Sequence, residues 1–124
     1  MRTPPLLPRA LLAGVFLDGG IRTFREAEKK TAPAERLGLP NPERMVRFDS
    51  AAKVVGGAAM ALGILPRLAA TGLAISLIPT TLGAHRFWEL PDPGQRTMQM
   101  TQFLKNAGLL GGLLMVAFWP NGED

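Results

Sequence analysis

Cysteine is absent from this 124-residue chain, and histidine occurs only once. The lack of cysteine excludes disulfides, thiolate metal ligands and a cysteine nucleophile within the chain. The single histidine, His85, has no second histidine to join it, and Asp49 and Glu89 stand at no recognisable ligand spacing from it. We therefore predict no metal or haem site, and any redox chemistry must be supplied by another molecule.

Signals for hydrolysis and for nucleic-acid binding are also missing. Ser76 lies in an apolar run without a nucleophile elbow, so its hydroxyl is expected to bond back to a helix carbonyl. The formal net charge is +4, but the basic residues gather between apolar segments instead of forming one continuous stripe. We predict no nucleic-acid partner and attribute the charge pattern to membrane topology.

Four apolar segments make up most of the chain, at residues 6–21, 46–65, 68–84 and 103–119. Each is close to the span of about 20 apolar residues that crosses a bilayer. The length fits a single domain over residues 1–124. The sequence therefore predicts an all-α fold, a four-helix transmembrane bundle with antiparallel up-down topology. A soluble helical bundle is the alternative, although the third and fourth segments lack amphipathic periodicity.

The connections between these segments indicate how the helices are arranged and which way they face in the membrane. The polar linker 22–45 is broken by proline and glycine and is expected to hold a short surface helix at 33–37. The tight turn at 63–67 makes the second and third segments antiparallel neighbours. Nine lysines and arginines lie in or next to the first and third linkers, against three at the N-terminus and the second turn. We predict that the linkers face the cytoplasm and both termini lie outside.

The first segment is interpreted as a retained helix because Asp18 interrupts it before any small-residue cleavage site. Glycine recurs in all four segments, which permits close helix approach within a membrane. The same glycine-rich faces allow contact between copies of the chain, so an oligomer is possible from the sequence.

Several of these pieces together resemble the bacterial DoxX family, and the resemblance spans nearly the whole chain. The residues that carry it are Gly19-Gly20-Ile21, Leu37-Gly38-Leu39-Pro40, Gly56-Gly57, Leu62-Gly63, Arg67-Leu68-Ala69-Ala70, His85-Arg86-Phe87-Trp88 and Phe103-Leu104-Lys105-Asn106. The resemblance implies a four-helix protein of the bacterial plasma membrane. It also implies an association with redox systems, through the small membrane subunits of thiosulfate:quinone oxidoreductases and membrane partners of detoxifying enzymes. Many relatives carry glutamate where this chain has Lys53.

Polar and aromatic side chains at a similar depth on the linker side form the candidate site. They are Asp18, Arg22, Asp49, Lys53, His85, Trp88, Lys105 and Asn106. Each of the two aspartates stands one helical turn before a basic residue, so each pair can meet side by side. Lys105 and Asn106 are expected to open the fourth helix, where they would meet His85 at the same membrane face. This arrangement predicts a polar vestibule.

Two interpretations of the vestibule stay open. In the first, it binds a quinone: His85 hydrogen-bonds a quinone carbonyl, Lys53 and Lys105 stabilise an anionic head group, and Trp88 stacks on the ring. In the second, the charges form ion pairs or snorkel to the interface, and the tryptophan is an interfacial anchor.

Three functions follow from these interpretations. The first is a non-catalytic membrane subunit or anchor of a redox or detoxification system, with the lipid bilayer and a redox protein as partners. The second is a carrier of a small solute or lipophile, although no internal repeat is visible between the halves. The third is a purely structural membrane protein.

Overall fold

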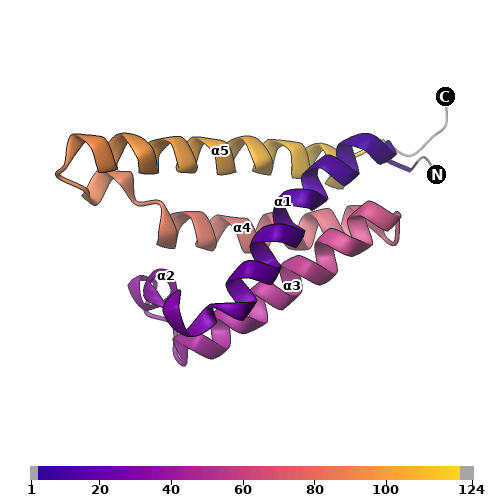
Figure 1. The fold of residues 1–124 in the computed structure, drawn as a ribbon. Coiled ribbons are helices and arrows are strands. Elements are labelled where there is room, and N and C mark those ends of the chain that lie inside the picture. The colour runs from indigo at the N-terminus through magenta and orange to yellow at the C-terminus, as the bar shows by residue number, and fades with distance from the viewer. Residues whose placement is uncertain (1–2, 121–124) are drawn as a thin grey trace.

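The computed structural model describes residues 3–120, and this part of the chain folds into helices without a strand. The four long helices are α1 (Leu6–Arg25), α3 (Pro42–Leu62), α4 (Pro66–Ala84) and α5 (Pro93–Ala117), shown in Figure 1. Short helical turns connect them: η1 (Ala27–Lys29), α2 (Ala32–Arg36) and η2 (Phe87–Glu89). The predicted all-α class is confirmed, and α2 forms where the short linker helix was predicted.

Local sequence signals explain where the helices begin and end. Proline stands in the first turn of α3, α4 and α5, where its missing N–H costs no helical bond. The Asp92 carboxylate caps α5 by accepting a 2.9 Å hydrogen bond from the Gln95 backbone N–H. Helix α3 ends at Gly63, which has a left-handed φ of 76° that suits glycine.

Helix α5 begins well before the apolar segment predicted at 103–119, because Asp92 and Pro93 start the helix in polar sequence. Lys105 and Asn106 therefore lie in the middle of α5. The expectation that these two residues open the helix was wrong, since hydropathy reports the apolar part of a helix and not its first turns.

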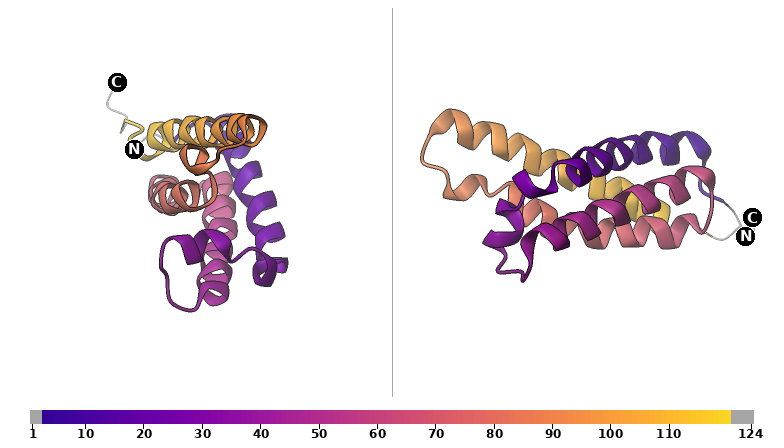
Figure 2. Two further views of the ribbon diagram at one scale, coloured as in Figure 1. Left: turned by 90° about the vertical axis from the view of Figure 1, so that its left-hand side faces the viewer. Right: turned by 60° about the horizontal axis from the view of Figure 1, so that its bottom comes forward.

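The long helices form two pairs that diverge from a common end. Helix α1 packs along α3, while α4 packs against both α5 and α3. Figures 1 and 2 show α1 and α3 separating from α4 and α5 toward the end of the molecule that carries α2. Helices α1 and α5 come close at Leu12, where a Cβ on Gly112 would lie 3.0 Å from the leucine Cδ2. The two pairs thus enclose a wedge that α2 partly covers.

Two arginines tie helix ends together opposite the open end of the wedge. Arg9 is 7% exposed, and its Nη1 donates to the carbonyl oxygen of Met60 at 2.8 Å. Its Nε donates to the carbonyl oxygen of Pro4, also at 2.8 Å. Arg67 Nε donates to the carbonyl oxygen of Trp119 at 3.0 Å. The start of α1, the α3–α4 turn and the end of α5 are held at one end of the molecule.

The apolar side chains divide into a narrow core and an unusually apolar exterior. The core contains Phe16, Met60, Leu73, Leu77 and Leu113. Large apolar side chains point outward from all four long helices, among them Leu11, Val55, Ile75 and Met115, each about two-thirds exposed. Soluble monomers rarely expose apolar surface on every side. Within residues 3–120, the stretch Pro66–Glu89 is the one that is long and apolar enough to cross a membrane by those two criteria.

Glycine serves close packing at some positions and not at others. A Cβ on Gly20 would lie 2.8 Å from Val54 Cγ2 and 2.9 Å from the Ser50 carbonyl oxygen, so only glycine lets α1 approach α3 here. A Cβ on Gly14 or Gly19 would meet no atom within 4 Å. The packing role expected for these glycines therefore holds for Gly20 but not for its neighbours on the same helix.

Candidate functional site

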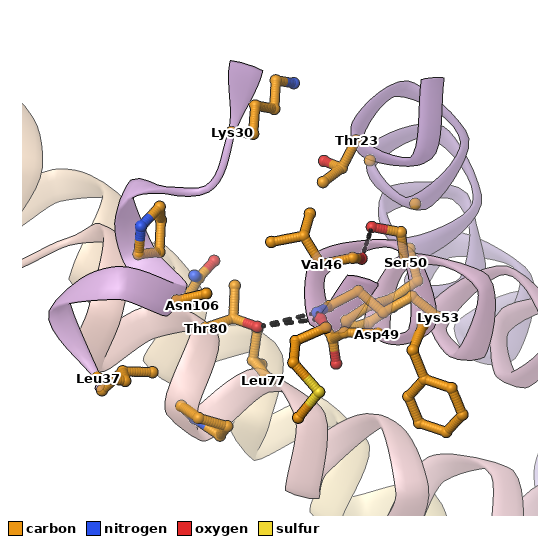
Figure 3. A pocket seen from close by; sticks show the side chains of 18 of the residues that line it. Thr23, Lys30, Leu37, Val46, Asp49, Ser50, Lys53, Leu77, Thr80 and Asn106 are labelled. Carbon is orange, nitrogen blue, oxygen red and sulfur yellow. Dashed lines mark hydrogen bonds and ion pairs between the residues drawn. The ribbon is translucent and has the colours of Figure 1, made fainter. Parts of the chain in front are cut away.

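A cavity of about 370 Å³ lies in the wedge between the two helix pairs (Figure 3). Its volume falls in the range of about 300 to 1,000 Å³ that is typical of small-molecule sites. Every long helix and α2 contribute to the lining, which is mainly apolar, with a few polar side chains among them: Thr23, Lys30, Asp49, Ser50, Lys53, Thr80 and Asn106.

On its polar side, the cavity is lined by Asp49, Lys53 and Thr80, which form a cluster of four side chains with Ser76, a residue of α4 outside the lining. Lys53 Nζ forms an ion pair with Asp49 Oδ2, as their one-turn spacing predicts, and donates to Thr80 Oγ1 at 2.9 Å. Ser76 Oγ donates to the other carboxylate oxygen of Asp49. The expectation that Ser76 bonds back to its own helix was wrong, because the carboxylate on the facing helix is a stronger acceptor.

Burial makes the ion pair the main electrostatic feature of the cavity wall. The Lys53 side chain is 12% exposed and that of Asp49 is 38% exposed. Charges in an apolar setting are stable when they are paired and hydrogen-bonded. The four-residue cluster meets that condition and carries no net charge. Two of the three N–H groups of Lys53 are engaged, which leaves one donor.

Asn106 approaches the cavity from α5 and is 8% exposed. Its Nδ2 donates to Thr81 Oγ1 at 3.0 Å, while that hydroxyl donates to the carbonyl oxygen of Leu77 at 2.8 Å. Since the Thr81 hydroxyl proton is donated to Leu77, the Thr81 oxygen can only accept from Asn106. The NH₂ group of the Asn106 amide therefore points toward Thr81. The Oδ1 atom of Asn106 accepts no hydrogen bond from the described residues and is left as an acceptor beside the cavity.

Helix α2 forms one wall of the cavity through Pro33, Ala34 and the adjoining Leu37. Arg36 Nη1 donates to the carbonyl oxygen of Gly83 at 2.9 Å, which links α2 to the end of α4. A Cβ on Gly83 would lie 2.8 Å from the carbonyl oxygen of Pro33. The absence of a side chain at Gly83 therefore lets α2 sit against α4.

The other predicted site residues lie away from the cavity lining. Asp18 and Arg22 form the expected ion pair at 2.9 Å, with both side chains exposed. His85 Nδ1 lies 2.7 Å from Gln99 Oε1, where a hydrogen bond links the end of α4 to α5. Lys105 is exposed on α5.

Trp88 packs edge-on against two phenylalanines, with ring centroids 5.2 Å from Phe87 and 5.9 Å from Phe103. Of the eight residues predicted for the site, Asp49, Lys53 and Asn106 line the cavity. Whether any of the eight binds a ligand stays a prediction.

Ser76 and Thr80 were missed as members of the site, although the sequence contains a signal for them. They stand one helical turn apart in an apolar segment, as Asp49 and Lys53 do in the preceding one. Lys53 also lies ten residues before the 63–67 turn, and Ser76 lies nine residues after it. In a helical hairpin such positions lie at the same level, so the two pairs face each other.

The chemistry available at the cavity is hydrogen bonding to an uncharged or weakly polar head group. One N–H of Lys53 and the Oδ1 of Asn106 offer a donor and an acceptor. Within residues 3–120, no three histidine, aspartate or glutamate side chains gather as a metal site requires.

The DoxX family model matches residues 5–86, which include α1 to α4 and the whole Asp49–Lys53–Ser76–Thr80 cluster. Asn106 and α5 lie beyond the matched segment. No curated protein and no solved structure matches the chain.

Proposed function

The chain belongs to the DoxX family of small helical membrane proteins, and on this basis we propose that α1, α3, α4 and α5 all span the bacterial plasma membrane. These helices contain 20, 21, 19 and 25 residues. At about 1.5 Å per residue, such lengths match a hydrocarbon core of about 30 Å. The apolar exterior of every long helix supports the same proposal. The linkers would face the cytoplasm, as the positive-inside rule predicts.

Two charged residues, Arg9 of α1 and Lys53 of α3, are compatible with spanning because their charges are satisfied inside the protein. Arg9 donates to backbone carbonyls, and Lys53 is paired with Asp49. Charged side chains inside membrane proteins are found mainly in such partnered arrangements. Trp88 and Trp119 follow the ends of α4 and α5, where aromatic side chains commonly anchor a span at the interface.

For the biochemical role, we propose a non-catalytic subunit or anchor of a redox or detoxification system that holds a quinone-sized lipophile in the cavity. One observation carries this proposal: a neutral, hydrogen-bonded ion pair with one N–H donor to spare on the wall of a mainly apolar cavity. Such a wall can hydrogen-bond a polar ring substituent while the apolar lining covers the rest. The chain has no cysteine, so a partner enzyme would carry out any thiol chemistry.

The ligand is tested by thermal unfolding in mild detergent, with and without decylubiquinone. We expect the quinone to raise the melting temperature of the wild type and of Lys105→Ala, whose side chain is exposed. Asn106→Ala, one position along, should lose the shift because it removes a polar group from the cavity. The absence of a shift in every form, including the wild type, would reject the quinone site.

The partner is tested by affinity purification from the native membrane. We expect a redox or detoxifying enzyme to co-purify in a fixed ratio to the chain and to dissociate at high detergent. Isolation of the chain alone under several mild detergents would contradict the anchoring role. The quinone site is judged separately, by the melting-temperature test.

A further inference from the structure

We infer that the ligand of this cavity is an uncharged amphiphile that enters sideways from the bilayer, with its hydrocarbon tail lying in the gap between α1 and α5. This inference rests on the proposed function, since it assumes that the cavity holds a lipophile in a membrane. It adds the class of ligand, its orientation and its route.

The gap follows from the divergence of α1 and α5. The two helices touch where Gly112 meets Leu12, at the end opposite α2. Farther along, the cavity is lined by Val15 and Gly19 of α1 and by Leu109 of α5. Val15 is 45% exposed, and a Cβ on Gly19 would meet no atom within 4 Å. The cavity therefore continues outward between the helices past small or apolar residues.

The chemistry of the gap suits a hydrocarbon chain. Val15, Gly19 and Leu109 offer no hydrogen-bonding side chain, and the gap opens on the apolar exterior that would face lipid. A methylene chain passing from the bilayer into this gap leaves one apolar environment for another.

The head group is uncharged because both lysines that line the cavity are already paired, Lys53 with Asp49 and Lys30 with Glu26. A free carboxylate or phosphate would bring an unbalanced negative charge next to the Asp49 carboxylate in a mainly apolar cavity. A carbonyl can instead accept from the remaining N–H of Lys53, and a hydroxyl can donate to Asn106 Oδ1. Figure 3 shows the Lys53, Thr80 and Asn106 side chains along the cavity. The tail then leaves toward Gly19 and Leu109.

The test compares two substitutions at glycines of α1, each at a position where an added Cβ would meet no atom within 4 Å. Gly19→Phe fills the gap, whereas Gly14→Phe adds the same side chain where nothing lies within 4 Å and no cavity is lined. Binding of decylubiquinone and of its tail-less ring, 2,3-dimethoxy-5-methyl-1,4-benzoquinone, is measured for both variants and the wild type in lipid nanodiscs. Ratios between variants cancel the partitioning of each probe into lipid.

We expect Gly19→Phe to bind decylubiquinone about tenfold more weakly than Gly14→Phe does, because the phenyl ring takes the place of the tail in the gap and removes its packing contacts there, a loss of about 1.4 kcal/mol. Binding of the tail-less ring should be unchanged. If Gly19→Phe weakens the binding of both probes equally, or of neither, the inferred position of the tail is overturned, while the binding site in the cavity stands. Failure of both probes to bind the wild type would overturn the proposed function itself.

Discussion

Arg9 Nη1 donates a 2.8 Å hydrogen bond to the carbonyl oxygen of Met60 and so connects the start of α1 to the last turn of α3. The carbonyl groups at a helix C-terminus lack partners within the helix and carry partial negative charge. A buried guanidinium supplies hydrogen-bond donors to these carbonyl groups and a positive charge next to their partial negative charge. The same side chain also donates to the Pro4 carbonyl, so one arginine organises this end of the helix pair.

Replacing this arginine should destabilise the protein. We expect Arg9→Met to lower the free energy of unfolding by about 2 to 3 kcal/mol, because hydrogen bonds to a charged group contribute about 1.5 to 3 kcal/mol. Arg25→Met, at an exposed position at the end of α1, should change it by less than about 0.5 kcal/mol. Thermal and denaturant unfolding in detergent measure both. Equal losses would show that Arg9 acts only as a surface charge.

The Asp49–Lys53 pair should show coupling in a double-mutant cycle. Breaking a fully buried pair costs about 3 to 5 kcal/mol. Asp49 is 38% exposed, so we expect a smaller loss, about 1 to 3 kcal/mol, for Lys53→Met. The double variant Asp49→Asn, Lys53→Met should be less destabilised than the sum of the two single variants, because no uncompensated charge remains. Strict additivity in equilibrium unfolding would contradict the pairing.

Alanine substitutions at two glycines of α1 should have opposite effects on the free energy of unfolding. Gly14→Ala should raise the free energy of unfolding by about 0.5 to 1 kcal/mol, since it lowers the backbone entropy cost without meeting another atom. Gly20→Ala should lower it by about 1 to 3 kcal/mol, since its Cβ would press on Val54 and the Ser50 carbonyl. Melting curves of the two variants in one detergent decide the sign. Stabilisation by both would mean that α1 and α3 are farther apart than described.

Displacement of α2 should follow from a small change in α4. In Gly83→Ala, the new Cβ would approach the Pro33 carbonyl oxygen to 2.8 Å, so the α2 backbone must shift. We expect faster amide hydrogen exchange at Leu37 and Leu39, whose N–H groups bond within this turn. Gly72→Ala, on the same helix and in open space, serves as the control. Unchanged exchange in Gly83→Ala would mean that α2 is not seated on α4.

Much of the local structure could be predicted from the sequence. The apolar segments, the short helix after Pro33 and the turn near Gly63 follow from hydropathy and from proline and glycine signals. The Asp49–Lys53 pair follows from one-turn spacing on a helix. The early start of α5 was missed because its first turns are polar, although Asp92 and Pro93 are a recognisable start signal.

The helical class, the apolar character of the segments and the spacing of charges along each helix follow from neighbours within a few residues, so they are readable in the chain itself. The packing of the helices is needed to bring Ser76 and Thr80 to Asp49 and Lys53, and to place Asn106 but not Lys105 at the cavity. Those relations depend on how the helices diverge from the contact between Leu12 and Gly112. The crossing of two helices is set by side-chain contacts between segments far apart in the chain, which no local pattern specifies.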